Sequence, residues 1–287
     1  MTLTELLVVM TIILMLASMT IEVVGKAIEK AEYGAWVAYK SNLKMDPACS
    51  LYLDFQEGPG GGLPKNTAQC TNIKRYKTSA LNAREIAGGG PFGSTTNAVP
   101  TWTSSPAVRR WPQKHAMQFY GSNSLYIANC EATQWKGAMT ILTWIRTTDY
   151  HSYQYIVDKW WYSGGDRRAW SLNLAGNNIW WRGIGDGGEH RAIYNLASLY
   201  PESDPQWVHI AATYDEVNLK LYIDSELVKT VAHTDNRSTT KPIQIGSGNN
   251  GNDYEYRGFI DELVILNRAL SQKEIQNHYE AGGGVLE

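Results

Sequence analysis

A single carboxylate near the start of the chain has unusually apolar surroundings. Glu5 precedes a long apolar run from Leu6 to Val24, which is interrupted only by small Thr and Ser residues and by Glu22. An ionised carboxylate costs roughly 2 to 3 kcal/mol or more to bury unpaired in a membrane. We therefore expect a positively charged group to meet Glu5.

The other carboxylates and the histidines form no pattern typical of an active site. A retaining glycoside hydrolase needs two carboxylates about 5 Å apart in one cleft. The chain has no Glu-x-Asp-x-x-Glu run, and the neighbours Asp261 and Glu262 would point to opposite faces of a strand. The six His residues are scattered singly, without an H-x-x-x-H pair or a G-x-S-x-G elbow. The sequence indicates that the protein is not an enzyme.

Two tryptophan doublets are the remaining candidates for a functional surface. Trp160 precedes Trp161, and Trp180 precedes Trp181. Adjacent side chains on a strand face opposite ways, so we expect one Trp of each doublet to face outwards. An exposed indole suits either a sugar ring or a neighbouring subunit. Both interpretations stay open, and of the two we favour the subunit contact.

Composition excludes one class of partner and points to a β-rich protein. The chain has 26 basic and 28 acidic residues, a balance that gives no reason to expect binding to nucleic acid. Its 26 Gly, 11 Trp and 17 Tyr residues are typical of a turn-rich β structure. Its three cysteines suggest one bridge and one leftover thiol, and we favour a Cys49–Cys70 disulfide.

The element that must position Glu5 is one long helix over residues 1–46. The apolar run has about the 20 residues that a bilayer core requires, so we expect it to span a membrane. Helix formers continue beyond it, Glu22 and Lys26 have the i,i+4 order that supports a helix, and Pro47 ends it. Gly25 and Gly34 are its weak points.

The stretch MTLTELLVVMTIILMLASMTIEVVG resembles the mature N-terminus of bacterial type IV pilins and pseudopilins, which combine Thr-Leu-x-Glu with a long apolar run. The resemblance implies that a prepilin peptidase removes a short basic leader and that Met1 then carries a methylated α-amino group. It also implies that Glu5 pairs with Met1 of a neighbouring subunit, so that two groups costly to bury alone offset each other during assembly.

Residues 47–287 change to short alternating runs bounded by turn residues, which predicts a β-sandwich head. Examples are TILTWIRT, RAWSLNLAG and WVHIAATYD. The runs NLKLYID and ELVKTVAH flank a turn at Asp224 and Ser225 and predict a hairpin. A stretch near residues 58–108 is loop-like, and we interpret it as an insertion available for subunit contacts.

Several phrases resemble the laminin-G-like, concanavalin A-like jelly-roll family, and together they cover residues 50–280. They are SLYLDFQEG, AMQFYGSNSLYI, MTILTWIRT, WVHIAATYDEVNLKLYIDSELV, PIQIGS and FIDELVILNRALSQKEIQNHY. The resemblance implies a structural calcium ion held by Asp261, Glu57 and backbone carbonyls near Gly121. Where many relatives have Asp, however, this chain has Tyr120 and Asn123, and Asp261 bonding only to backbone amides is the alternative.

The sequence as a whole predicts a long N-terminal α-helix plus an all-β jelly-roll sandwich head. We expect a structural subunit of a type IV pilus-like extracellular filament, whose head serves adhesion or glycan binding. The alternatives are a minor pilin or pseudopilin of a type II secretion-like machine, or a membrane-anchored lectin that does not polymerise. The expected partners are copies of the chain, the inner membrane before assembly, the prepilin peptidase and pilus assembly machinery, and a glycan.

Overall fold

The computed structural model describes residues 3–56, 84–85, 101–103, 115–121, 124–127, 129, 133–134, 136–150, 153–160, 168–185, 187–248 and 254–282. The chain divides into two compact units, Met1–Asn42 and Leu43–Glu287.

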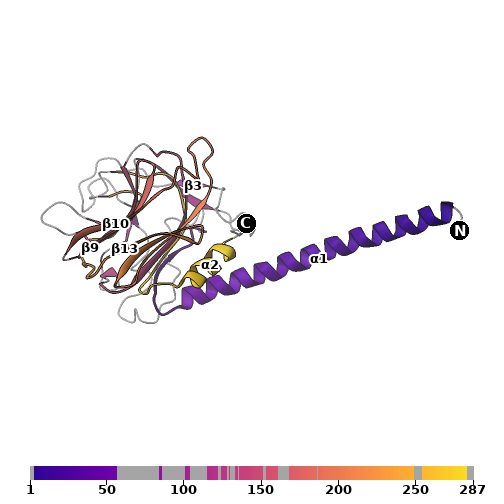
Figure 1. Cartoon of the computed structure of the whole chain (residues 1–287), viewed down its shortest axis with the longest axis horizontal. Helices are drawn as coiled ribbons and strands as arrows, with labels where there is room; N and C mark the ends of the chain where they lie inside the picture. The colour runs from indigo at the N-terminus through magenta and orange to yellow at the C-terminus, as the bar shows by residue number, and fades with distance from the viewer. Residues whose placement is uncertain are drawn as a thin grey trace. The chain divides into compact units, whose positions relative to one another are not determined.

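The first unit is formed by helix α1 (Leu3–Met45), which runs without a break through Gly25 and Gly34 (Figure 1). Lys26 Nζ lies 2.6 Å from Glu22 Oε1, which confirms the predicted i,i+4 pair. The segment Leu7–Met45 has a mean hydropathy of 2.4 in its most apolar window, and it is long and apolar enough to cross a membrane. Its described side chains between Leu7 and Val24 are exposed, so the helix has an apolar surface that water alone would not stabilise.

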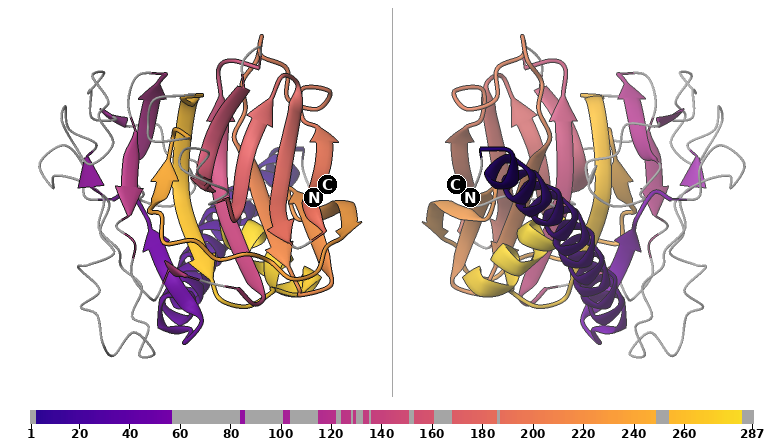
Figure 2. Two further views of the ribbon diagram at one scale, coloured as in Figure 1. Left: turned by 90° about the vertical axis from the view of Figure 1, so that its left-hand side faces the viewer. Right: turned by 90° about the vertical axis from the view of Figure 1, so that its right-hand side faces the viewer.

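The head of the second unit consists of two antiparallel sheets, whose strands stand side by side in Figure 2. Among the described residues, the first sheet has the order β13-β12-β11-β6-β15-β4-β3, with β1 also paired to β15. Its strands are β1 (Cys49–Leu53), β3 (Thr101–Thr103), β4 (Ala116–Tyr120), β6 (Met139–Thr147), β11 (Val208–Tyr214), β12 (Asn218–Ile223), β13 (Glu226–Ala232) and β15 (Arg257–Leu266).

The second sheet has the order β10-β9-β8-β7-β14-β5-β2 within the same described ranges. Its strands are β2 (Arg84–Glu85), β5 (Leu125–Ile127), β7 (Tyr153–Lys159), β8 (Trp170–Ala175), β9 (Asn178–Gly185), β10 (Gly188–Asn195) and β14 (Ile243–Ile245). The short strands β2 and β3 extend one edge of each sheet. They fall in the stretch near residues 58–108 that we expected to be loop-like, and the rest of that stretch lies outside the described residues.

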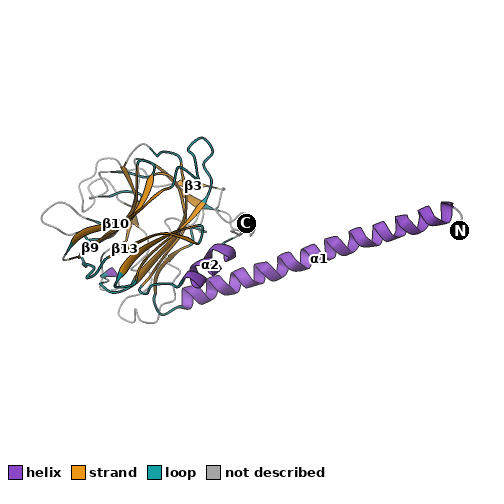
Figure 3. Ribbon diagram, in the orientation of Figure 1, coloured by secondary structure: helices purple, strands orange, loops and turns teal. Residues whose placement is uncertain are grey.

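The core lies between the two sheets, whose strands are coloured orange in Figure 3, because alternate residues of each strand face inwards. Leu172 of β8 and Leu221 of β12 are both completely buried in it. Trp181 of β9 is also completely buried, and its Nε1 donates a hydrogen bond of 2.9 Å to the carbonyl oxygen of Thr213 on β11. This indole therefore packs between the sheets and links them.

Two local predictions about the head are confirmed. Asp224 and Ser225 form the turn between β12 and β13, with φ values of 47° and 71°, as a two-residue hairpin turn requires. Helix α2 (Gln272–Ala281) begins at a complete capping box, in which Ser271 and Glu274 satisfy each other's backbone N–H groups.

Helix α2 covers the outer face of the first sheet. Tyr279 stacks on Trp144 of β6 with ring centroids 5.7 Å apart, and His278 Nδ1 lies 2.9 Å from His209 Nε2 of β11. Both histidines are buried. Burial lowers the pKa of His209 well below its usual range, and the neighbouring His278 lowers it further. The outer face of the second sheet carries the candidate site.

Candidate functional site

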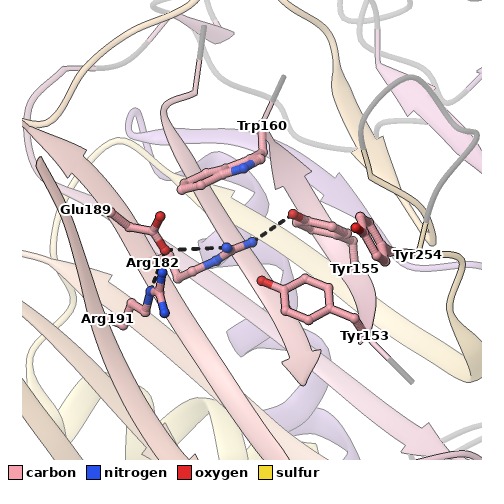
Figure 4. A pocket seen from close by; sticks show the side chains of 7 residues that line it. All are labelled: Tyr153, Tyr155, Trp160, Arg182, Glu189, Arg191 and Tyr254. Atoms are coloured by element: carbon pink, nitrogen blue, oxygen red, sulfur yellow. Dashed lines mark hydrogen bonds and ion pairs between the residues drawn. The ribbon is translucent and has the colours of Figure 1, made fainter. Parts of the chain in front are cut away.

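A cavity of about 450 Å³ opens on the outer face of the second sheet. Four aromatic side chains, two arginines and one glutamate line it: Tyr153, Tyr155, Trp160, Arg182, Glu189, Arg191 and Tyr254 (Figure 4). These residues come from β7, from the position just after it, from β9 and β10, and from the segment before β15. The site therefore depends on strand pairing and not on one continuous motif.

Strand register places a polar row across the outer face of the second sheet, and two of its residues, Arg182 and Arg191, line the cavity. Gln244, Asp158, Ser171, Arg182 and Arg191 lie directly opposite one another on β14, β7, β8, β9 and β10 in turn. Residues directly opposite each other on neighbouring strands share a face of the sheet. On each of these strands at least one neighbouring residue belongs to the core, so this row points away from it.

Arg182 is the centre of the site. Its Nε donates to Ser171 Oγ at 2.8 Å, and its Nη2 donates to the hydroxyl of Tyr155 at 2.9 Å. Its guanidinium carbon lies 4.2 Å from the ring centroid of Trp160 and 5.5 Å from that of Tyr153. Figure 4 shows the guanidinium between these two rings, with Glu189 on one side and Tyr155 on the other. Hydrogen bonds and cation–π contacts thus hold this charge in a fixed place.

Glu189 is shared by three arginines. Its carboxylate accepts a hydrogen bond of 2.5 Å from Arg191 Nε, while Arg182 Nη1 and Arg168 Nη1 lie at 3.5 Å and 3.6 Å. Arg191 also lies over the ring of Trp180, at 4.9 Å from its centroid. The described charged side chains that line or border the cavity are therefore mostly positive.

Asp158 belongs to the same polar row as Arg182, with Ser171 between them, and is completely buried. Neither of its carboxylate oxygens, and neither polar atom of the Gln244 side chain, has a hydrogen-bond partner of ordinary geometry in the described part of the chain. Burial raises the pKa of Asp158 well above its usual range, and the attraction of Arg182 and the backbone N–H of Trp160 oppose this rise only in part. The carboxyl of Asp158 therefore keeps its proton to a higher pH than an ordinary aspartate does.

The two tyrosines of β7 behave similarly. Burial raises the pKa of Tyr153 and of Tyr155, and the positive charge of Arg182 lowers both to a smaller extent. Both hydroxyls are therefore protonated at neutral pH and are available as hydrogen-bonding groups at the wall of the cavity.

The tryptophan doublets occupy different positions. Trp160 lines the cavity but only 1% of its surface is exposed, and Trp161 lies outside the described residues. Trp180 is half-buried on the outer face, whereas Trp181 is in the core, as the alternation along a strand predicts. A ligand-binding role for these side chains stays a prediction.

The residues expected to hold calcium are not brought together where they can be located. Asp261 is buried opposite Trp144, and its Oδ1 accepts a hydrogen bond of 2.9 Å from the backbone N–H of Glu262. The backbone N–H of Gly121 instead donates to the carbonyl oxygen of Tyr256. Tyr256 lies five residues before Asp261, so Gly121 and Asp261 are separated by about 16 Å at about 3.3 Å per residue.

This register does not favour one ion shared by Asp261 and Gly121. Glu57, the third expected ligand, lies outside the described residues, so the expected calcium set stays a prediction. The ranges that the structure describes contain no cluster of three or more His, Cys, Asp or Glu residues that could hold a metal. Calcium binding by the expected set has no support from this arrangement.

Four further predicted positions are described only in part or not at all. Met1 and the side chain of Glu5 lie outside the described residues, although the backbone of Glu5 belongs to α1. Cys49 is completely buried, with its Sγ 3.7 Å from the carbonyl oxygen of Leu51. Cys70 is not among the described residues, so the Cys49–Cys70 disulfide stays a prediction.

Sequence reasoning missed most of the cavity. Tyr153 and Tyr155 occupy alternate positions on β7, Trp180 and Arg182 on β9, and Glu189 and Arg191 on β10. This two-residue spacing was a usable signal that each pair shares a face. The sequence did not reveal that the three pairs lie next to one another.

Comparison with known proteins identifies the architecture. Residues 119–276 match the family Laminin_G_3, described as the concanavalin A-like lectin/glucanases superfamily. The structure is similar to the binding domain of Paraclostridial Mosquitocidal Protein 1, with a TM-score of 0.59, 17% identity and coverage of 83% of this chain and 52% of that chain.

The structure is also similar to the botulinum neurotoxin serotype D ligand binding domain in complex with N-acetylneuraminic acid. The TM-score is 0.57, the identity is 16%, and the match covers 86% of this chain and 52% of that chain. This chain thus spans about half the length of the solved chains it matches, and at such identities the likeness is one of fold. No curated protein sequence matches the chain significantly.

Proposed function

Since this chain belongs to the concanavalin A-like lectin/glucanases superfamily, we propose that its head is a carbohydrate-binding module without catalytic activity. We further propose that helix α1 anchors this module first in a membrane and then in a type IV pilus-like filament. The observation that carries the first part is the cavity on the second sheet, which combines aromatic walls with fixed hydrogen-bond donors.

The lining of the cavity has the chemistry that sugars require. Tyr254 is 49% exposed, and its ring lies against the ring of Tyr153, with centroids 5.0 Å apart. Flat aromatic faces pack against the apolar C–H face of a sugar ring, while arginine and tyrosine groups bond its hydroxyls. The volume of about 450 Å³ lies within the range of small-ligand sites. The solved complex of a similar fold with N-acetylneuraminic acid supports the same class of ligand.

A glycan array tests this proposal. The full chain, held in lipid nanodiscs so that no glycoside detergent competes, should bind a defined subset of glycans, and Tyr254→Ala should weaken that binding. Tyr120→Ala is the matched control, because Tyr120 is 48% exposed but lies on β4 of the other sheet. Equal losses in both variants would count against the cavity as the site, and no binding to any glycan would refute the function.

The filament part of the proposal is supported by the first unit. An apolar helix with exposed side chains from Leu7 to Val24 needs lipid or neighbouring helices to cover it. The position of Glu5 before this run gives a reason for assembly, because a carboxylate and the α-amino group of Met1 offset each other's burial cost when two subunits meet. The head would then be displayed on the outside of the filament.

Electron microscopy of filaments sheared from cells tests this part. Abundant wild-type filaments that contain the chain should be lost in Glu5→Ala and retained in Glu22→Ala. Glu22 is a suitable control because it is exposed on the same helix and pairs with Lys26. Filaments that persist in Glu5→Ala would refute the assembly role. If the wild type forms no filaments of this chain, a minor pilin or pseudopilin, or an anchored lectin, replaces the proposal.

A further inference from the structure

The described groups around Arg182 compensate its charge only weakly. Arg168, Arg182 and Arg191 all approach one carboxylate, that of Glu189, and only Arg191 does so at a short distance. A carboxylate that bonds one arginine closely and stands 3.5 Å from Arg182 compensates the second charge weakly. Glu189 therefore offsets the charge of Arg182 only in part.

Asp158 is also a weak counter-charge for Arg182. It is the next acidic side chain in the polar row, separated from Arg182 by Ser171. Because complete burial raises its pKa, Asp158 gives up its proton less readily than an ordinary aspartate does. Arg182 remains a positive group in a largely desolvated setting, where its electrostatic attraction is less screened than on the surface.

Arg182 also has hydrogen-bonding capacity to spare. Its side chain is 5% exposed, and a guanidinium carries about five N–H groups. Its contacts with Ser171, Tyr155 and Glu189 use one N–H on each of its three nitrogens. The remaining N–H groups have no partner among the described residues, although the side chain lines the cavity. The rings of Trp160 and Tyr153 hold the guanidinium so that it cannot turn away from an incoming ligand.

We propose that the cavity selects sugars that carry an acidic group, a carboxylate or a sulfate. The anionic oxygens bind Arg182 and Arg191, and the sugar ring lies against the aromatic walls. Arg191 is 44% exposed beside Trp180, so it is placed where a ligand enters. Planar guanidinium groups match such oxyanions in charge and in hydrogen-bond geometry. This inference rests on the proposed carbohydrate-binding function and narrows its ligand class.

The test compares sugars that differ only in their charge. The full chain in nanodiscs of zwitterionic lipid is applied to matched pairs on an array: sialylated against unsialylated lactose, a glucuronic acid terminus against a glucose terminus, and sulfated against unsulfated chains. The acidic member should bind in preference. Raising NaCl from about 0.05 M to about 0.5 M should weaken that binding, because salt screens charge attraction.

Arg191→Gln should reduce the affinity for the acidic member roughly ten- to hundredfold, the range for hydrogen bonds to charged groups. Arg257→Gln is the matched control, since it removes the same charge from an arginine that is 55% exposed on β15 of the other sheet. Arg182→Gln is a second variant, and near-ultraviolet circular dichroism checks that each variant is folded.

Each outcome has a separate meaning. A preference for acidic sugars that Arg191→Gln removes and Arg257→Gln retains supports the inference, and the carboxylate and sulfate pairs then identify the anion. Equal binding of acidic and neutral members overturns the inference but leaves carbohydrate binding intact. A preference that survives in both Arg191→Gln and Arg182→Gln overturns the assignment to this cavity. No binding at all removes the proposed function and the inference together.

Discussion

Replacing Asp158 by Asn should stabilise the head at neutral pH, although the change removes a charged residue from the interior. Asp158 is completely buried, and neither of its oxygens has a hydrogen-bond partner of ordinary geometry among the described residues. Ionising such a group costs free energy that Arg182, placed beyond Ser171, offsets only in part. Asn has nearly the same shape and no charge to bury.

The sign and slope of the effect follow from proton linkage. The folded pKa of Asp158 is raised above its unfolded value of about 3.9. The stability that this group contributes is therefore fully present below about pH 4 and is lost as pH rises through the folded pKa. Between the unfolded and the folded pKa, the unfolding free energy of the wild type should fall by up to about 1.4 kcal/mol per pH unit relative to that of Asp158→Asn. Below about pH 4 the difference in unfolding free energy between the two proteins should not change with pH.

Urea unfolding followed by tryptophan fluorescence, repeated across this pH range, measures the difference in unfolding free energy between Asp158→Asn and the wild type. Taking the difference cancels the titration of the histidines, which both proteins share. Asp204→Asn, at an exposed carboxylate, controls for replacing any carboxylate by an amide. If Asp158→Asn is less stable than the wild type at pH 7, or if the difference does not change with pH, the attraction to Arg182 dominates and the reasoning is wrong.

Two further predictions concern the face of the first sheet that α2 covers. Because burial and the adjacent His278 lower the pKa of His209, the stability associated with neutral His209 is present above about pH 6.5. That stability should be lost as pH falls from there, at up to about 1.4 kcal/mol per pH unit. His209→Gln should therefore make the unfolding free energy, measured by urea titration, depend less on pH. Ser271→Ala removes the N-cap of α2 and should lower the unfolding free energy by about 1 kcal/mol, whereas Ser198→Ala, in an exposed loop, should change it less.

Much of the architecture could be predicted because it depends on residues close together in the chain. The apolar run after Glu5 predicted a long helix, and α1 extends over Leu3–Met45 without a break. The alternation of apolar residues predicted strands, and the turn at Asp224 and the capping box at Ser271 were read from four or fewer consecutive positions. Such features are local in their physics, since backbone geometry and near-neighbour hydrogen bonds produce them.

The calcium prediction had no such local basis. It joined Asp261 to a carbonyl near Gly121 by resemblance to relatives. The pairing of β15 with β4 instead places Gly121 beside Tyr256, a considerable distance along the strand from Asp261. Which positions meet across two strands depends on their register. Since β4 and β15 are more than a hundred residues apart in the chain, no short stretch of sequence shows which of their residues pair.

The sequence by itself determined the apolar helix, the β character of the head, and the pairs of side chains that share a face on each strand. Only the tertiary structure decided that side chains from β7, β9 and β10 line one cavity, and that β14 brings Gln244 beside Asp158 from more than eighty residues away. The physical reason is that helix periodicity and strand alternation act over a few residues, whereas a binding site of this kind is made by strand order. Strand order depends on how the whole core packs, and no short stretch of the chain contains that information.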